Sequence, residues 1–250
     1  MIQAIEELSI NAWPELQTLV YDGWVLRFAD GHTKRANSVN PLYPSRLDVQ
    51  DKIGTCEQIY GSRGLSVIFK MTSAVHPDDL DAHLAARGYR VDSLTSVQTL
   101  SLGDRDDPAA PSARLSESLT AEWLLAYCRM SGVDGQRAPV LGRMLGNIIP
   151  ARCFASLHDG DRAIACGLTV TQDGFTGLYD IVTDGELRGR GYGQQLVLSL
   201  LVWGKRQGAH TAYLQVMLDN MPALRLYAGL GFREIYRYWY RIKSWQDLCI

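Results

Sequence analysis

The stretch Arg188-Gly189-Arg190-Gly191-Tyr192-Gly193 decides the fold that we expect for this chain. It follows a strand-like run, 177–183, and opens a helical run. In that run, apolar residues recur at spacings near three and four: Leu196, Val197, Leu200, Leu201 and Trp203. Glycines let a backbone come close to a ligand, and the unpaired amides of a helix's first turn attract an anion. Because two arginines add positive charge, the stretch predicts a pyrophosphate-binding turn.

Two common phosphate-binding patterns do not fit this turn. A Walker loop needs a lysine followed by serine or threonine after its last glycine, and here Gln194 and Gln195 follow Gly193. The dinucleotide pattern GxGxxG also fails, because the glycines fall at every second position. The pattern Q/R-x-x-G-x-G/A does fit, with Arg188, Gly191 and Gly193 in its defined positions.

A second motif, DNMPALRLYAGLGF, occupies residues 219–232. It fits N-x-x-A-x-x-x-Y-x-x-x-G-F. Asn220 is expected to be a helix N-cap, and Gly231 is expected to end that short helix in a left-handed conformation. Tyr227 then lies on the same helix face as Ala223.

The two motifs, in this order and with a helix and the strand 211–216 between them, resemble the GNAT superfamily of N-acetyltransferases. The resemblance covers about residues 115–241 and implies an α/β (α+β) fold, a mixed, mostly antiparallel sheet flanked by helices. It also implies that acetyl-CoA is the co-substrate. One departure is the family's V-x-P step, where this chain has Thr183-Asp184-Gly185. The residues that the resemblance assigns to the cofactor are Ile181, Val182, Thr183, Arg188, Gly189, Arg190, Gly191, Tyr192, Gly193, Gln194 and Asn220.

The N-terminal half repeats the order of elements of the C-terminal half, ending a helix at Gly88-Tyr89 as the other half does at Gly231-Phe232. We therefore predict a degenerate GNAT-like domain at 1–104, a linker at 105–113 and a catalytic GNAT domain at 114–250. Leu84 stands where Tyr227 stands, and no glycine-rich turn lies between residues 40 and 49, so the first domain is not expected to bind CoA. The alternative is an unrelated α+β extension.

Acetyl transfer to an amine needs a group that takes a proton from the amine, because a lysine-type amine has a pKa near ~10.4. Asp180 is the candidate, since a carboxylate within an apolar strand is costly to bury. Binding a cationic substrate, or a hydrogen bond to a nearby loop, are the alternatives for Asp180. By resemblance, backbone amides around Ile181–Thr183 stabilise the oxyanion, and Tyr227 protonates the leaving thiolate. The alternative for Tyr227 is a tyrosine packed in the core.

Candidates for binding the acceptor are few in the sequence. The run 33–40 is predicted to be a strand with polar residues on both faces, either at a sheet edge or lining a site. An arginine and two asparagines would suit an acceptor with a carboxylate. The candidates are Arg35, Asn37, Asn40, Tyr236 and Tyr240.

Composition excludes several other classes of function. The formal net charge of the 250 residues is −2, so nucleic-acid binding is not expected. No apolar run approaches the ~20 residues of a membrane span, and the first residues carry acid rather than the base of a signal peptide. Five cysteines without a CxxC pair indicate reduced thiols, and scattered histidines predict no metal site. We expect a cytoplasmic protein, with a homodimer as an open possibility.

The sequence thus predicts an N-acetyltransferase that transfers an acetyl group directly from acetyl-CoA to a primary amine of a small molecule, amino acid or peptide. O-acetylation and longer acyl donors stay open. The alternative is a non-catalytic acyl-CoA-binding sensor, which would need the turn at 188–193 but not Tyr227.

Overall fold

The computed structural model describes residues 1–103 and 113–248, so the predicted linker lies almost wholly outside the described residues. The chain forms two compact units, Met1–Ser96 with Tyr236–Ile250, and Val97–Ile235. The unit boundaries fall within strands β5 (Arg90–Ser101) and β11 (Arg233–Lys243). This division differs from the linear one that we predicted, because β11 from Tyr236 onward belongs to the first unit. There it pairs antiparallel with β4 (Val67–Met71).

The first unit is a sheet with helices, and its strands follow the order β1-β2-β3-β4-β11. Its core is built around Trp24, Phe69 and Tyr60, which are fully buried. Its remaining elements are α1 (Ile2–Ala12), β1 (Gln17–Tyr21), β2 (Trp24–Phe28), η1 (Lys34–Ala36), β3 (Val39–Asn40), α2 (Val49–Gly61), α3 (Leu80–Ala86) and η3 (Trp245–Leu248).

Two local features of the first unit bear on the predictions. The strand predicted for 33–40 is wrong over most of its length, because Thr33 caps a short 3-10 helix and only Val39–Asn40 pair as a strand. The N-terminus of helix α2 is capped, because the Asp48 carboxylate accepts hydrogen bonds from the amides of Gln50 and Asp51. These amides are the groups that would hold an anion at this helix end, and a carboxylate of the chain already occupies them.

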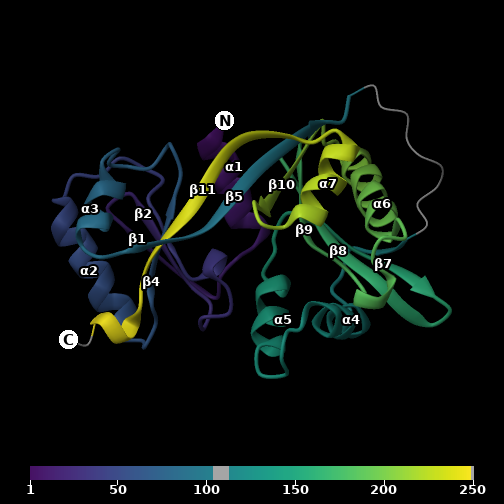
Figure 1. Cartoon of the computed structure of the whole chain (residues 1–250), viewed down its shortest axis with the longest axis horizontal. Helices are drawn as coiled ribbons and strands as arrows, with labels where there is room; N and C mark the ends of the chain where they lie inside the picture. The colour runs from purple at the N-terminus through teal and green to yellow at the C-terminus, as the bar shows by residue number, and fades with distance from the viewer. Residues whose placement is uncertain (104–112, 249–250) are drawn as a thin grey trace. The chain divides into compact units, whose positions relative to one another are not determined.

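The second unit carries both sequence motifs. Its sheet has the order β5-β10-β9-β8-β7-β6 (Figure 1). The pairs β6–β7, β7–β8 and β8–β9 are antiparallel, and β9 pairs parallel with β10. The elements are β6 (Arg114–Ser116), α4 (Ala121–Ser131), α5 (Ala138–Gly146), β7 (Ala151–Asp159), β8 (Arg162–Gln172), β9 (Phe175–Thr183), η2 (Gly185–Leu187), α6 (Tyr192–Arg206), β10 (Thr211–Met217) and α7 (Met221–Leu230).

Helices α4 and α6 cover opposite faces of this sheet. Ala155 and Leu157 of β7 belong to the core cluster that α6 completes, whereas Phe154, which points the other way, contacts Trp123 of α4. Alternation along a strand places neighbouring residues on opposite faces. The sheet is therefore buried on both sides, which confirms the predicted α/β class and its mostly antiparallel sheet.

The expected behaviour of the cysteines is confirmed for the four that are described. Cys56, Cys128, Cys153 and Cys166 are free and buried, and Cys249 lies outside the described residues. Burial raises the pKa of Cys56, Cys153 and Cys166 to about 12. These thiols are therefore unreactive at neutral pH.

Two kinds of feature are absent from the described residues: a membrane-spanning helix and a metal-binding cluster. Within 1–103 and 113–248, no helix has both the length and the apolar character needed to cross a bilayer. The same residues contain no cluster of three or more histidine, cysteine, aspartate or glutamate side chains placed to bind a metal ion.

Candidate functional site

Strands β9 and β10 of the second unit pair over only part of their length. Their parallel register runs from Phe175↔Thr211 to Leu178↔Leu214 and ends there. Strand β9 nevertheless continues to Thr183 and keeps its pairing with β8 to that point. The backbone edge of residues 179–183 that faces β10 is therefore open to another hydrogen-bonding chain.

A β-bulge in β9 accompanies this opening. Leu168 pairs with Tyr179 and Cys166 pairs with Val182, so that two residues of β9, Asp180 and Ile181, lie opposite Gly167 alone. Asp180 has a φ of 54°, a left-handed conformation that is unusual for a residue other than glycine. The bulge changes the direction of the strand immediately before the segment Ile181–Thr183.

The glycine-rich turn lies beside this open edge, and together they line a pocket of about 600 Å³. That volume falls within the range of about 300–1,000 Å³ typical of small-molecule and cofactor sites. The lining residues are Ile181, Val182, Thr183, Leu187, Arg188, Gly189, Gly191, Tyr192, Gly193, Gln194, Asn220, Pro222, Ala223, Arg225, Leu226 and Tyr227.

The N-terminus of α6 faces this pocket without a side-chain cap. Gly191 is its N-cap residue with a φ of 84°, and Gly189 has a φ of 77°. No atom lies within 4 Å of a Cβ built on either glycine. By contrast, the side chains of Thr120 and Asn220 cap the helices α4 and α7. The first-turn amides of α6 are therefore available to an anion.

Tyr227 belongs both to the pocket lining and to the core cluster. It packs edge-on against Phe232, with ring centroids 5.8 Å apart. Burial raises its pKa to about 12, so the phenol stays protonated at neutral pH. The capping predicted for its helix is confirmed, because the Asn220 side chain accepts a hydrogen bond from the Ala223 amide and Gly231 ends the helix with a φ of 93°.

Asp180 lies at the bulge, next to the pocket-lining segment but not among the lining residues. Its Oδ1 accepts a hydrogen bond of 3.0 Å from the Tyr127 hydroxyl of α4. Tyr127 stacks on Trp123, with ring centroids 5.3 Å apart and an interplanar angle of 4°. The carboxylate is thus held by a side chain that the sequence motifs do not include.

The pocket brings together most of the residues predicted to bind the cofactor, with Arg190 as the exception. Sequence reasoning missed Leu187, Pro222, Ala223, Arg225 and Leu226. Four of these belong to the first turns of α7. The helical period, counted from Asn220 and Tyr227, could have predicted that they lie on the same side of the helix. Leu187 had no comparable signal.

The predicted acceptor residues lie in the first unit, and most are buried. Asn37 and Asn40 are 4% and 1% exposed. The Asn37 side chain accepts a hydrogen bond from the Ala29 amide and donates one to the Thr33 carbonyl, and the Asn40 side chain donates to the Ser38 carbonyl. The Tyr236 hydroxyl donates to Glu6, and Tyr240 is also buried. Arg35 is half-buried, with its guanidinium carbon 5.7 Å from the centroid of a Trp13 ring. A role in acceptor binding stays a prediction for all five residues.

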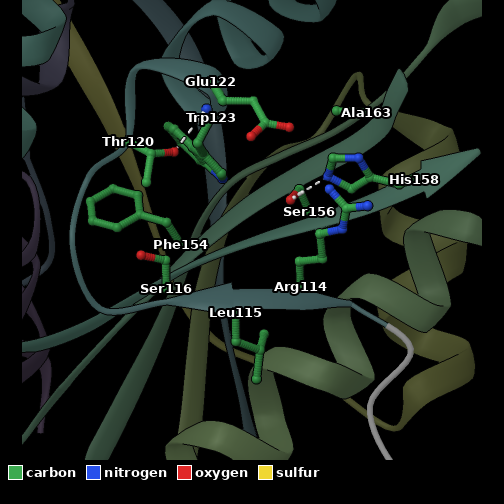
Figure 2. A pocket seen from close by; sticks show the side chains of 10 residues that line it. All are labelled: Arg114, Leu115, Ser116, Thr120, Glu122, Trp123, Phe154, Ser156, His158 and Ala163. Carbon is green, nitrogen blue, oxygen red and sulfur yellow. Dashed lines mark hydrogen bonds between the residues drawn. The ribbon is translucent and has the colours of Figure 1, made fainter. Parts of the chain in front are cut away.

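A second, smaller pocket of about 120 Å³ lies between α4 and the β6–β7 pair (Figure 2). Ser156 and His158 form a hydrogen bond of 3.0 Å on its wall, and Trp123 and Phe154 lie side by side within it. It contains none of the residues of either motif and has a fifth of the volume of the larger pocket. The larger pocket is therefore the candidate cofactor site.

Comparison with known proteins agrees with this geometry. A family model described as "Probable histone acetyltransferase Rv0428c C-terminal" matches residues 1–241. The chain is 31% identical over 246 residues to the uncharacterized N-acetyltransferase YobR of Bacillus subtilis, covering 97% of this chain and 98% of YobR.

Two solved structures share the fold over nearly the whole chain. A GCN5-related N-acetyltransferase from Kribbella flavida has a TM-score of 0.68 at 16% identity, covering 96% of this chain and 95% of that one. A tandem GNAT protein from the clavulanic acid biosynthesis pathway has a TM-score of 0.67 at 16% identity, covering 96% and 87%. The division into a degenerate and an intact GNAT-like domain stays a prediction. The chain therefore belongs to the family of the Rv0428c C-terminal region and is an N-acetyltransferase of the GNAT superfamily.

Proposed function

We propose that this protein transfers an acetyl group from acetyl-CoA to a primary amine of a small molecule, an amino acid or a peptide. The observation that carries the proposal is the open edge of β9 beside the uncapped N-terminus of α6. One elongated ligand could use both features, with amide groups that pair with the open edge of β9 and a pyrophosphate that binds the free amides of α6. Acetyl-CoA has that construction, and when bound it supplies a reactive acyl thioester.

The residues of the pocket divide between binding and chemistry. The amides of Tyr192, Gly193 and Gln194, together with the Arg188 guanidinium, would hold the pyrophosphate. The backbone of Ile181–Thr183 would pair with the pantetheine amides as an added strand and stabilise negative charge that develops on the thioester oxygen.

Proton movements need two further groups. Asp180 would take a proton from the acceptor amine, or would bind that amine as a cation before it reacts. Tyr227 would donate to the departing sulfur. Its raised pKa keeps the hydroxyl a donor at every pH at which the protein would work. A protein that only sensed acyl-CoA would need neither group, which favours the enzyme over the sensor.

The acceptor class is proposed from the family rather than from the pocket. The family description names a probable histone acetyltransferase, so lysine-containing histone peptides belong beside amino acids, polyamines and aminoglycosides in an acceptor panel. The four free, buried thiols favour a reducing compartment, and we propose the cytoplasm.

A thiol-release assay across this panel tests the proposal, run beside a thermal shift with CoA. Turnover with one acceptor class together with stabilisation by CoA would support it. Stabilisation without turnover on any acceptor would favour the sensor. The absence of any CoA effect would contradict the cofactor site itself.

Gly191→Ala is expected to raise the Kd for CoA about tenfold, because the new side chain strains the left-handed turn by roughly 1–2 kcal/mol. The Cβ itself meets no atom within 4 Å, so the effect would come from the backbone rather than from a clash. Isothermal titration with CoA measures it.

Gly160→Ala is the matched control, since Gly160 has a φ of 58° and equally open space at the β7–β8 turn. It should lower the Tm to a similar extent and leave the Kd unchanged. An equal Kd for Gly191→Ala and the wild type would show that the turn does not hold the cofactor.

A further inference from the structure

We propose that helix α4 is a clamp that fixes the cofactor-facing segment Ile181–Thr183, with Tyr127 and Arg129 as positioning residues. Both side chains come from α4, and they reach two carboxylates that lie on either side of the segment at the end of β9. Tyr127 donates to Asp180 on one side of the segment, and Arg129 donates to Asp184 on the other. The inference rests on the proposed function, because it assigns these residues to the shaping of the CoA site.

Asp184 makes several hydrogen bonds. Its Oδ2 accepts hydrogen bonds from Arg129 at 2.9 Å and from Arg162 at 2.7 Å. Its Oδ1 accepts from the Glu186 amide, and its own amide donates to the carbonyl of Ile164 at 2.9 Å. The hydrogen bond from Arg129 and, to a smaller extent, that from Arg162 lower the pKa of the Asp184 carboxyl. Asp184 is therefore ionised at neutral pH and joins α4, β8 and the turn that leads to the glycines.

The helix that carries Tyr127 and Arg129 is itself anchored to the sheet. Thr120 caps its N-terminus, and the Trp123 indole donates a hydrogen bond of 2.9 Å to the carbonyl of Ala155 in β7. Figure 2 shows Trp123 next to Phe154 in the wall of the smaller pocket. Tyr127 stacks on the same indole. The position of the Tyr127 hydroxyl is thus set by the packing of β7 rather than by the cofactor site.

The segment Ile181–Thr183, between Asp180 and Asp184, needs support from α4 because β9 is paired there on one edge only. A strand in the middle of a sheet is held by backbone hydrogen bonds on both of its edges, but the pairing of β9 with β10 stops at Leu178. Residues 181–183 keep only the ladder to β8, interrupted by the bulge at Asp180. Two charged hydrogen bonds at residues 180 and 184 replace part of the missing restraint and leave the open edge free for the ligand.

Hydrogen–deuterium exchange of the protein without ligand tests the clamp directly. Arg129→Gln and the double variant Tyr127→Phe/Arg129→Gln should speed exchange in peptides covering 179–187 severalfold, and the double variant should do so more strongly. Arg162→Gln removes the other guanidinium from the same Asp184 oxygen but leaves α4 attached, so its effect should be smaller. Equal exchange in all variants and the wild type would overturn the proposal.

CoA titration gives the functional readout. Because Arg129 is partly exposed, Arg129→Gln should raise the Kd about threefold, and the double variant about tenfold. In Arg129→Gln the KM for acetyl-CoA should rise while kcat stays close to the wild type. Asp81→Asn, which breaks a comparable Asp–Arg pair with Arg241 in the first unit, should lower the Tm without changing the Kd.

The two proposals fail in different ways. If the wild type does not bind CoA, the proposed function is wrong, and the exchange experiment alone decides whether α4 fixes the segment. If CoA binds but Arg129→Gln only lowers the Tm, as Asp81→Asn does, then α4 is a structural support and the clamp is wrong.

Discussion

Tyr227→Phe is expected to lower kcat by about 10²- to 10³-fold while the Kd for CoA changes by less than about twofold. Tyr227 lines the pocket, and its ring packs against Phe232, so phenylalanine should occupy the same position. The substitution removes the proton donor and little else. Single-turnover kinetics with acetyl-CoA and the best acceptor measure the chemical step directly.

The pH dependence provides a second check on Tyr227. Because burial raises its pKa to about 12, its deprotonation should produce no falling limb in kcat below about pH 10. A limb near pH 8 that disappeared in Tyr227→Phe would contradict this assignment.

Tyr213→Phe is the matched control. Tyr213 of β10 is also buried, and its hydroxyl shares a hydrogen bond of 2.8 Å with the Tyr179 hydroxyl; neither tyrosine lines the pocket. Losing that bond should lower the Tm and leave kcat within about twofold. If the two variants lost activity equally, the effect of Tyr227 would be structural.

Asp180→Asn is expected to lower kcat/KM by about 100-fold at neutral pH if Asp180 takes the proton from the amine. Asparagine adopts the left-handed conformation more readily than most residues, so the bulge at φ 54° should persist. The variant tests the charge of the carboxylate rather than the backbone.

The pH profile separates the two roles proposed for Asp180. Without a base, the variant depends on amine that is already neutral in solution, whose fraction rises tenfold per pH unit below a pKa of ~10.4. Its log kcat/KM should therefore rise with a slope near one and approach the wild type at high pH. If Asp180 instead binds the cationic amine, the KM for the acceptor should rise and this recovery should be absent.

Asp173→Asn makes the same change at a residue with nearly the same conformation. Asp173 has a φ of 50° in the exposed β8–β9 turn, at the other end of the same strand. It should leave kcat/KM unchanged. A full loss of CoA binding in Asp180→Asn would show instead that the bulge, and not the proton transfer, depends on Asp180.

The sequence by itself determined the features that depend on neighbouring residues. The strand 177–183, the turn at 188–193 and the helix that follows could be predicted because apolar spacing, glycines with positive φ and capping side chains act within a few residues. The same applies to Asn220, Gly231 and the position of Tyr227 on α7. These local signals were sufficient for the family and for most of the pocket lining.

Only the tertiary structure decided how the pocket is opened and held. The end of the β9–β10 ladder at Leu178 and the bulge opposite Gly167 depend on the register of three strands, which no single segment encodes. Asp180 and Asp184 meet Tyr127 and Arg129 across more than fifty residues of sequence, because α4 packs on the face of the sheet opposite α6. Likewise, β11 from Tyr236 onward joins the first unit, where residues Trp239–Lys243 pair with β4. Local propensity determines where helices and strands form, but burial of their apolar faces determines which of them pack against one another.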